Sequence, residues 1–205
     1  MRKLLRRLGV RKLSREEPVD RLRRGQRLGA DSKVGLLVPA VDLVHRLQLK
    51  DLVAGLEKEE VDWFIVADTG LTRKAHAKAR AQRIQKLGLG QEVPPDFPQL
   101  SRVHCFWRDE CTSLGLPTSI PDRLDSADVL LTLDSTGSQL PLRAMMRRAK
   151  APFKVGPMQA DDGTLDFMLT WPDGGDMLSF VQVAFHYLKT LDLKWASDSK
   201  DWAWP

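Results

Sequence analysis

Hydrophobic and polar positions along the chain alternate between short apolar runs and stretches of helical spacing. Three runs have the length and near-continuous hydrophobicity of parallel strands covered on both faces: residues 33–39, 62–67 and 128–133. A stretch of helical spacing follows each run, over residues 42–59, 72–87 and from Pro141 onward. This succession predicts an α/β domain whose parallel sheet has these three strands at its centre.

The clearest unit runs from Ala127 to Met158. Its strand is followed by the polar turn 134–138 and by a helix in which Pro141 suits the first turn. Pro152 ends that helix before a second strand starts at Phe153. The helix has a core-facing stripe at Leu142, Met145, Met146 and Ala149. Strand, helix and strand together form a crossover unit of a parallel sheet.

The remaining pattern completes a single domain over residues 31–193. Strands are expected near 153–157 and 165–171, and the Asp161-Asp162-Gly163 turn between them suits a hairpin or a closely connected pair. Residues 102–107 form a third strand or an edge strand, and a last helix covers 176–191. We therefore predict a Rossmann-like three-layer domain of about five mainly parallel strands with helices on both faces. A basic N-terminal helical arm (1–30) precedes it, and a Trp-rich tail (194–205) follows.

Charge is distributed unevenly in this chain of 205 residues with a net charge of +5. Residues 1–27 carry a net +8 and residues 70–91 carry six cations and no acid, which leaves −9 on the rest of the chain. Two basic segments on an acidic body favour an anionic partner more than a uniformly basic surface would.

Each basic segment has more than one interpretation. The arm could be a solvated tail, a contact for RNA or a ribonucleoprotein, or a helix lying on anionic lipid. The 72–87 helix, with its thin apolar face, could be an ordinary solvated helix or a nucleic-acid contact. Neither segment has the interleaved aromatic residues of a single-strand stacking platform. The candidate nucleic-acid-binding residues are Arg2, Lys3, Arg6, Arg7, Arg11, Lys12, Arg23, Arg24, Arg73, Lys74, Lys78, Arg80 and Arg83.

The polar turn 134–138 lies between a strand end and a helix N-terminus, where open α/β sheets tend to bind ligands. Asp, Ser and Thr are also common helix caps, so capping alone explains the same residues. The alternative is a small anion site formed by Ser135, Thr136, Gly137, Ser138 and Arg143.

Several classes of function are disfavoured. The chain has neither the Gly-x-Gly-x-x-Gly fingerprint of dinucleotide-binding proteins nor a Gly-Lys-Ser/Thr phosphate loop. His104, Cys105, Asp109 and Cys111 lack the paired spacing or second ligand cluster of a zinc site. We therefore expect no metal, no cofactor and no catalytic residue. With no apolar run of membrane length, no signal peptide and only two cysteines, a cytoplasmic protein with reduced thiols is expected.

The strings ADVLLTLDS, PLRAMMRRAKAPFKVG, LDFMLTW and FHYLKTL resemble a family of short uncharacterised proteins of the Bacteroidota, which carries a domain-of-unknown-function label. The resemblance covers residues 1–68 and 125–192, whereas the insert around 70–120 is longer and more basic here. It implies a basic N-terminal segment, a Rossmann-like core and a cytoplasmic context, and transfers no catalytic residue. The 134–137 turn and the Val-Gly-Pro strand end also resemble, at the level of fold, one half of nucleotide-sugar glycosyltransferases.

The leading hypothesis is a non-enzymatic cytoplasmic binding protein that contacts RNA or a ribonucleoprotein such as the ribosome. The alternative is a phosphate- or nucleotide-sugar-binding transferase with its site at Asp134–Ser138. A protein partner held by Trp202 and Trp204, or an anionic membrane surface, are further partners that the sequence leaves open.

Overall fold

The structure is a computed structural model that describes residues 32–40, 43–58, 61–88, 97, 99–134, 139–157 and 163–169. The predicted arm, the predicted helix 176–191 and the Trp-rich tail lie outside these residues. Within the described part of the chain, no helix is long and apolar enough to cross a membrane.

Eleven elements make up the described fold. The strands are β1 (Lys33–Pro39), β2 (Asp62–Asp68), β3 (Val103–Phe106), β4 (Val129–Thr132), β5 (Phe153–Pro157) and β6 (Phe167–Leu169). The helices are α3 (Leu43–Leu56), α4 (Arg73–Lys86), the 3₁₀ helix η1 (Arg108–Glu110), α5 (Asp122–Asp125) and α6 (Leu140–Arg148).

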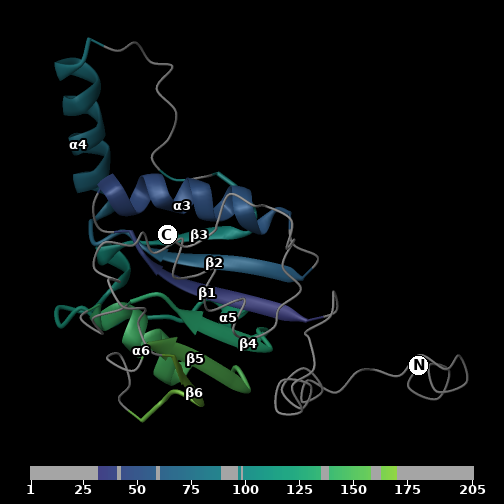
Figure 1. Ribbon diagram of the computed structural model, residues 1–205. Helices are drawn as coiled ribbons and strands as arrows, with labels where there is room; N and C mark the ends of the chain where they lie inside the picture. Colours follow the sequence, from purple (N-terminus) through teal and green to yellow (C-terminus); the bar gives the residue numbers. More distant parts are fainter. Residues whose placement is uncertain are drawn as a thin grey trace, which may run out of the picture.

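The strands form one sheet in the order β3-β2-β1-β4-β5-β6, and every neighbouring pair is parallel (Figure 1). This is the order of a Rossmann-like doubly wound sheet, which confirms the predicted fold class. The sheet has six strands rather than about five, because β3 pairs with β2 as an edge strand. The order reverses between β1 and β4, and the carboxyl ends of these strands meet there.

Two apolar clusters, one on each face of the sheet, produce the three layers. One face is covered by α3, through apolar residues that recur at helical spacing: Leu49, Leu52, Val53 and Leu56. On the other face lies the stripe of α6, whose four predicted residues at 142, 145, 146 and 149 are all buried. Because both faces are covered, the central strands are apolar along almost their whole length.

The sequence predicted a hairpin or a closely connected pair after β5. The hairpin is wrong, because β5 and β6 are parallel, but the two strands do pair with each other. Lys154 and Asp166 set this register: the Asp166 N–H donates to the Lys154 carbonyl over 2.9 Å, and the Lys154 N–H donates to the Asp166 carboxylate over 2.8 Å. The same pair of hydrogen bonds joins Lys33 at the start of β1 to Asp128 before β4. In each pair an aspartate aligns the starts of two parallel strands, a pairing that turn chemistry alone does not reveal.

Because Gly35 in β1 has no side chain, the side chains of the two adjacent strands pack over it at the centre of the sheet. A Cβ atom there would lie 2.5 Å from Cζ of Phe64 on β2 and 2.9 Å from Cδ1 of Leu130 on β4. We expect Gly35→Ala to lower the free energy of unfolding by about 1–3 kcal/mol, the usual cost of overpacking a core. Urea unfolding of the two proteins measures the difference.

A double-mutant cycle with Phe64→Leu tests the cause of that loss. Leucine removes the ring atoms that the new methyl group would meet, so Phe64→Leu should cost less in the Gly35→Ala background than in the wild type. Additive losses would show that the clash with Phe64 is not the reason for the glycine.

Candidate functional site

The helix α4 extends away from the three-layer body (Figure 1) and none of its side chains is buried. Its sequence favours a helix because alanine, arginine, lysine and glutamine dominate it. The side chain of Thr72 caps it by accepting the Ala75 N–H over 3.1 Å. The helix thus combines high intrinsic propensity with an N-cap, and none of its side chains is buried in the body of the domain.

The base of α4 is fixed to the segment that follows β3. The Arg108 N–H donates to the Leu71 carbonyl over 2.8 Å, and the Arg73 N–H donates to Oδ1 of Asp109 over 3.3 Å. Glu110 makes two further links: Oε1 pairs with the Arg73 guanidinium, and Oε2 accepts the Trp107 N–H over 3.0 Å. The direction in which α4 leaves the body is thus set by tertiary hydrogen bonds.

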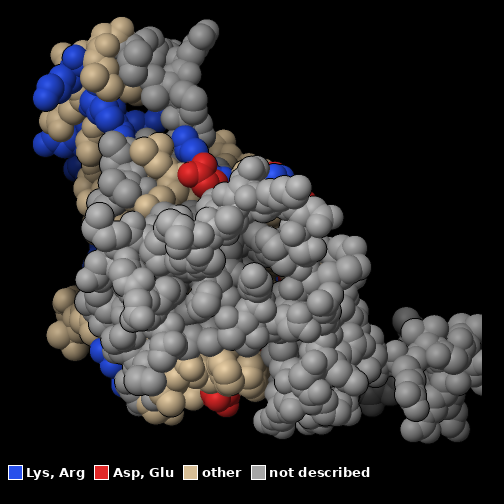
Figure 2. All heavy atoms as spheres, viewed as in Figure 1, with Lys and Arg blue, Asp and Glu red and all other residues tan. Residues whose placement is uncertain are grey.

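Lys and Arg side chains gather over α4 at the upper left of Figure 2. No acid interrupts them within the helix. Lys74, Lys78 and Lys86 are exposed, whereas Arg80 and Arg83 are half-buried. The structure thus brings the five predicted cations of this segment onto one projecting helix. The eight predicted cations of the N-terminal arm lie outside the described residues.

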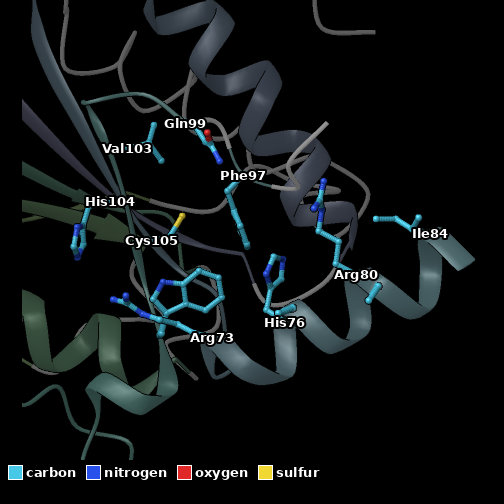
Figure 3. Close-up of a pocket in the computed structure, with 12 residues that line it drawn as sticks. Arg73, His76, Arg80, Ile84, Phe97, Gln99, Val103, His104 and Cys105 are labelled. Atoms are coloured by element: carbon cyan, nitrogen blue, oxygen red, sulfur yellow. The ribbon is translucent and has the colours of Figure 1, made fainter. Parts of the chain in front are cut away.

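A groove of about 630 Å3 runs between α4 and β3. Arg73, His76 and Arg80 line it from α4, and Cys105 of β3, Phe97 and Trp107 line it from the opposite side. The side chains of His76 and Phe97 converge in its lining (Figure 3), with ring centroids 5.3 Å apart. The Trp107 ring lies 5.1 Å from His76 and 5.8 Å from Phe97, edge-on to the latter.

This aromatic cluster was missed in the sequence because its members come from three separate segments. The only signal available there was the aromatic content of residues 97–107, which flanks the basic helix. Phe97 is itself buried, and the Arg46 guanidinium of α3 lies 5.4 Å from its ring centroid. The cluster is therefore supported from the body of the domain.

Cys105 lines the groove as a neutral thiol. Burial, with a smaller effect of the Glu110 carboxylate, raises its pKa to about 11. At neutral pH almost none of it is thiolate, the form that acts as a nucleophile or a metal ligand. Among the described residues, no three His, Cys, Asp or Glu side chains lie together as a metal site would require.

A second candidate site is the crevice at the strand-order reversal. Asp68 at the end of β2 and Asp134 after β4 flank the end of β1, and both are buried. Oδ1 of Asp68 accepts the Gly70 N–H over 2.9 Å, and Oδ2 is buried without a hydrogen-bond partner among the described residues. Burial is the main cause that raises the pKa of Asp68, and the nearby Asp134 carboxylate adds to it.

The predicted anion site falls at this crevice. Oδ2 of Asp134 accepts the Gln139 N–H over 2.8 Å, just before α6 begins. Asp134 thus binds the N–H of the residue at which α6 begins, while Gln139, the N-cap of α6, makes no capping hydrogen bond with its own side chain. Arg143 lies on α6, half-buried, and Ser135 to Ser138 lie outside the described residues.

Comparison with family models matches one segment of the chain, which covers the second half of the sheet. Residues 125–191 match DUF6913, a family of unknown function. The matched segment contains β4, α6, β5 and β6, and so carries Asp134 but neither α4 nor the groove. It agrees with the later part of the resemblance seen in the sequence, while residues 1–68 are not part of the match. No curated protein and no solved structure matches the chain significantly.

The raised pKa of Asp68 predicts a specific pH dependence. The folded chain holds this proton more strongly than the unfolded chain, so ionisation opposes folding as pH rises from the ordinary value of 3.8 through the folded-state pKa. Asp68→Asn removes this effect. The free energy of unfolding of the variant minus that of the wild type should increase with pH across the window and level off above it.

Urea unfolding from pH 3 upward measures this difference for Asp68→Asn and for a matched control, Asp51→Asn, which removes a carboxylate from the exposed surface of α3. The control should show no rise of this kind. A pH-independent difference for Asp68→Asn would contradict the assignment of a raised pKa to Asp68.

Proposed function

We propose that the protein is a non-enzymatic binding protein whose helix α4 contacts the phosphate backbone of RNA, free or within a ribonucleoprotein such as the ribosome. The observation that carries the proposal is the arrangement of α4: six cations and no acid on one helix that projects from the body. Lysine and arginine neutralise phosphates and release the counterions condensed on them. A projecting helix presents these charges to a large partner without a deep cavity.

The wider charge distribution supports the same proposal. The basic arm, residues 1–27, adds a net +8, while the chain outside the two basic segments is acidic. Opposite charge on the body would orient the molecule so that its basic parts face a polyanion. The proposal places the protein in the cytoplasm, where Cys105 and Cys111, which form no disulfide, stay reduced.

An enzyme that binds a phosphate or nucleotide sugar at Asp134–Ser138 is less well supported. The strand order favours a ligand at this edge of the sheet. The two carboxylates there, Asp68 and Asp134, are both buried and would disfavour an anionic ligand. Burial is the main cause of the raised pKa of Asp68, and Asp134 adds a smaller contribution.

Replacing cations of α4 should weaken binding to RNAs of different sequence by a similar factor, and it should reduce the salt dependence of binding. Lys74→Gln/Lys78→Gln removes two exposed charges from α4. We expect the slope of log Kd against log salt concentration to fall by about 1 to 2, since each phosphate contact contributes about 0.7–0.9. Titration of a structured RNA with full-length protein between 50 and 200 mM salt measures the slope.

The matched control is Lys50→Gln/Lys58→Gln, which removes the same charge from the α3 side of the body. It should leave the slope nearly unchanged. Equal effects of the two variants would mean that net charge, and not α4, governs binding; no binding of the wild type at 50 mM salt would reject the proposal. The same titration with a chain that lacks residues 1–30 measures how much the arm contributes to the affinity for RNA and to its salt dependence.

A further inference from the structure

The groove between α4 and β3 is lined by aromatic rings as well as by cations, and contacts with phosphates alone would not require the rings. From them we infer that it receives one unpaired nucleotide of a single-stranded RNA, with the base against Trp107 and His76 and the adjoining phosphates at Arg73 and Arg80. The inference rests on the proposed function and names the form of RNA that α4 takes. The groove volume of about 630 Å3 lies within the range of sites for small molecules.

Aromatic rings of the cluster provide the surface for a base. Trp107 and His76 are half-buried, so each ring is supported by the protein on one side while part of it stays in contact with the groove. Phe97 is buried beneath them and fixes their positions through ring contacts of 5.3 and 5.8 Å. Base–aromatic stacking of this kind tolerates any base, because every base has a π-face.

Cations lie along the same side of the groove. Arg73 and Arg80 are seven residues apart on α4, and therefore on the same helix face and about 10 Å apart along its axis. Two acids contact the Arg73 end of the groove. Asp109 accepts the backbone N–H of Arg73, and Glu110 pairs with the Arg73 guanidinium and accepts the backbone N–H of Trp107. By holding both groups, Glu110 ties the first turn of α4 to the residue that carries the indole ring, so that a cation of α4 and the ring line the same groove.

Paired bases could not reach these rings. The rings lie inside a groove bounded by α4 and β3, whereas bases of a duplex are stacked on one another and present only their edges. A base that is splayed out of a single strand can enter the groove, while the phosphates on either side of it stay on the exposed face of α4. Single-stranded RNA is therefore the partner to which the combination of charge and aromatic surface is complementary.

The test compares three RNA ligands of nearly equal phosphate number on full-length protein: a single-stranded 12-mer, a 12-mer of abasic ribose phosphates and a blunt duplex of two complementary GC-rich 6-mers, which has no unpaired base. We expect the single strand to bind about five- to tenfold more tightly than the abasic strand, as stacking of one base predicts. The duplex should not share this advantage of the single strand.

Two sets of variants locate the effect. Trp107→Leu should abolish the preference for bases, and Trp107→Phe, which keeps an aromatic ring, should retain most of it. Arg80→Gln, inside the groove, is matched by Lys86→Gln, which removes the same charge from α4 outside the lining. Lys86→Gln should weaken binding of the base-containing and abasic strands equally, whereas Arg80→Gln should weaken the base-containing strand more.

The possible results separate this inference from the proposed function. Equal binding of the base-containing and abasic strands, with a steep salt dependence, would overturn the stacked nucleotide and leave the phosphate contact intact. Failure of every RNA to bind would overturn both, as would binding to vesicles of anionic lipid alone. If Trp107→Leu fails to fold, the comparison of the base-containing and abasic RNAs on the wild-type protein still tests whether a base is stacked in the groove.

Discussion

The structure depends on the close approach of three strands at Gly35. β1 is hydrogen-bonded to β2 on one side and to β4 on the other, and the strand order reverses next to it. Phe64 and Leu130 project from these neighbours and meet over the glycine. A side chain at this position would separate them and disturb the central register. Since the two halves of the sheet join at β1, the packing at Gly35 governs how closely β2 and β4 pack around the central strand.

Both candidate sites follow from the parallel arrangement of the strands. Parallel strands bring their carboxyl ends to one edge, and the chain leaves that edge toward α4 after β2 and toward α6 after β4. Thr69 links two of these ends, because its hydroxyl donates to the Phe106 carbonyl over 2.9 Å and its N–H donates to the same oxygen over 3.1 Å. The connection between β2 and β3 is thereby closed at its base, and α4 starts from a fixed point.

Periodicity predicted the parts of the fold that depend on burial. The strands at 33–39, 62–67 and 128–133 and the stripe of α6 could be identified because full burial imposes a hydrophobic pattern on the local sequence. The direction of β6 could not, because it depends on a pairing between Lys154 and Asp166, and an Asp-Gly turn looks alike before a parallel and an antiparallel strand. Strand direction is a tertiary property at this edge of the sheet.

The candidate sites show the same limit more sharply. The cations of α4 are contiguous in sequence and were predicted, whereas the ring cluster joins His76, Phe97 and Trp107 from a helix, a loop and a strand end. No local pattern marks such residues, because only the pairing of β2 with β3 brings them together. Asp68 was overlooked for a related reason: as the last residue of a strand it is unremarkable in sequence, and its burial beside Asp134 arises from the strand order.

Electrostatics separates the two sites at this edge of the sheet. Buried carboxylates occupy the crevice at the reversal point, while the cations stand on α4, outside the body. A carboxylate in a low-dielectric crevice acts on a nearby anion with little screening, whereas exposed cations attract a polyanion over about 8 Å at physiological salt. By charge alone, we expect an anion to bind less favourably in the crevice than beside α4. An uncharged or proton-donating group would not meet this penalty at Asp68, so the crevice and the helix are suited to partners of different charge.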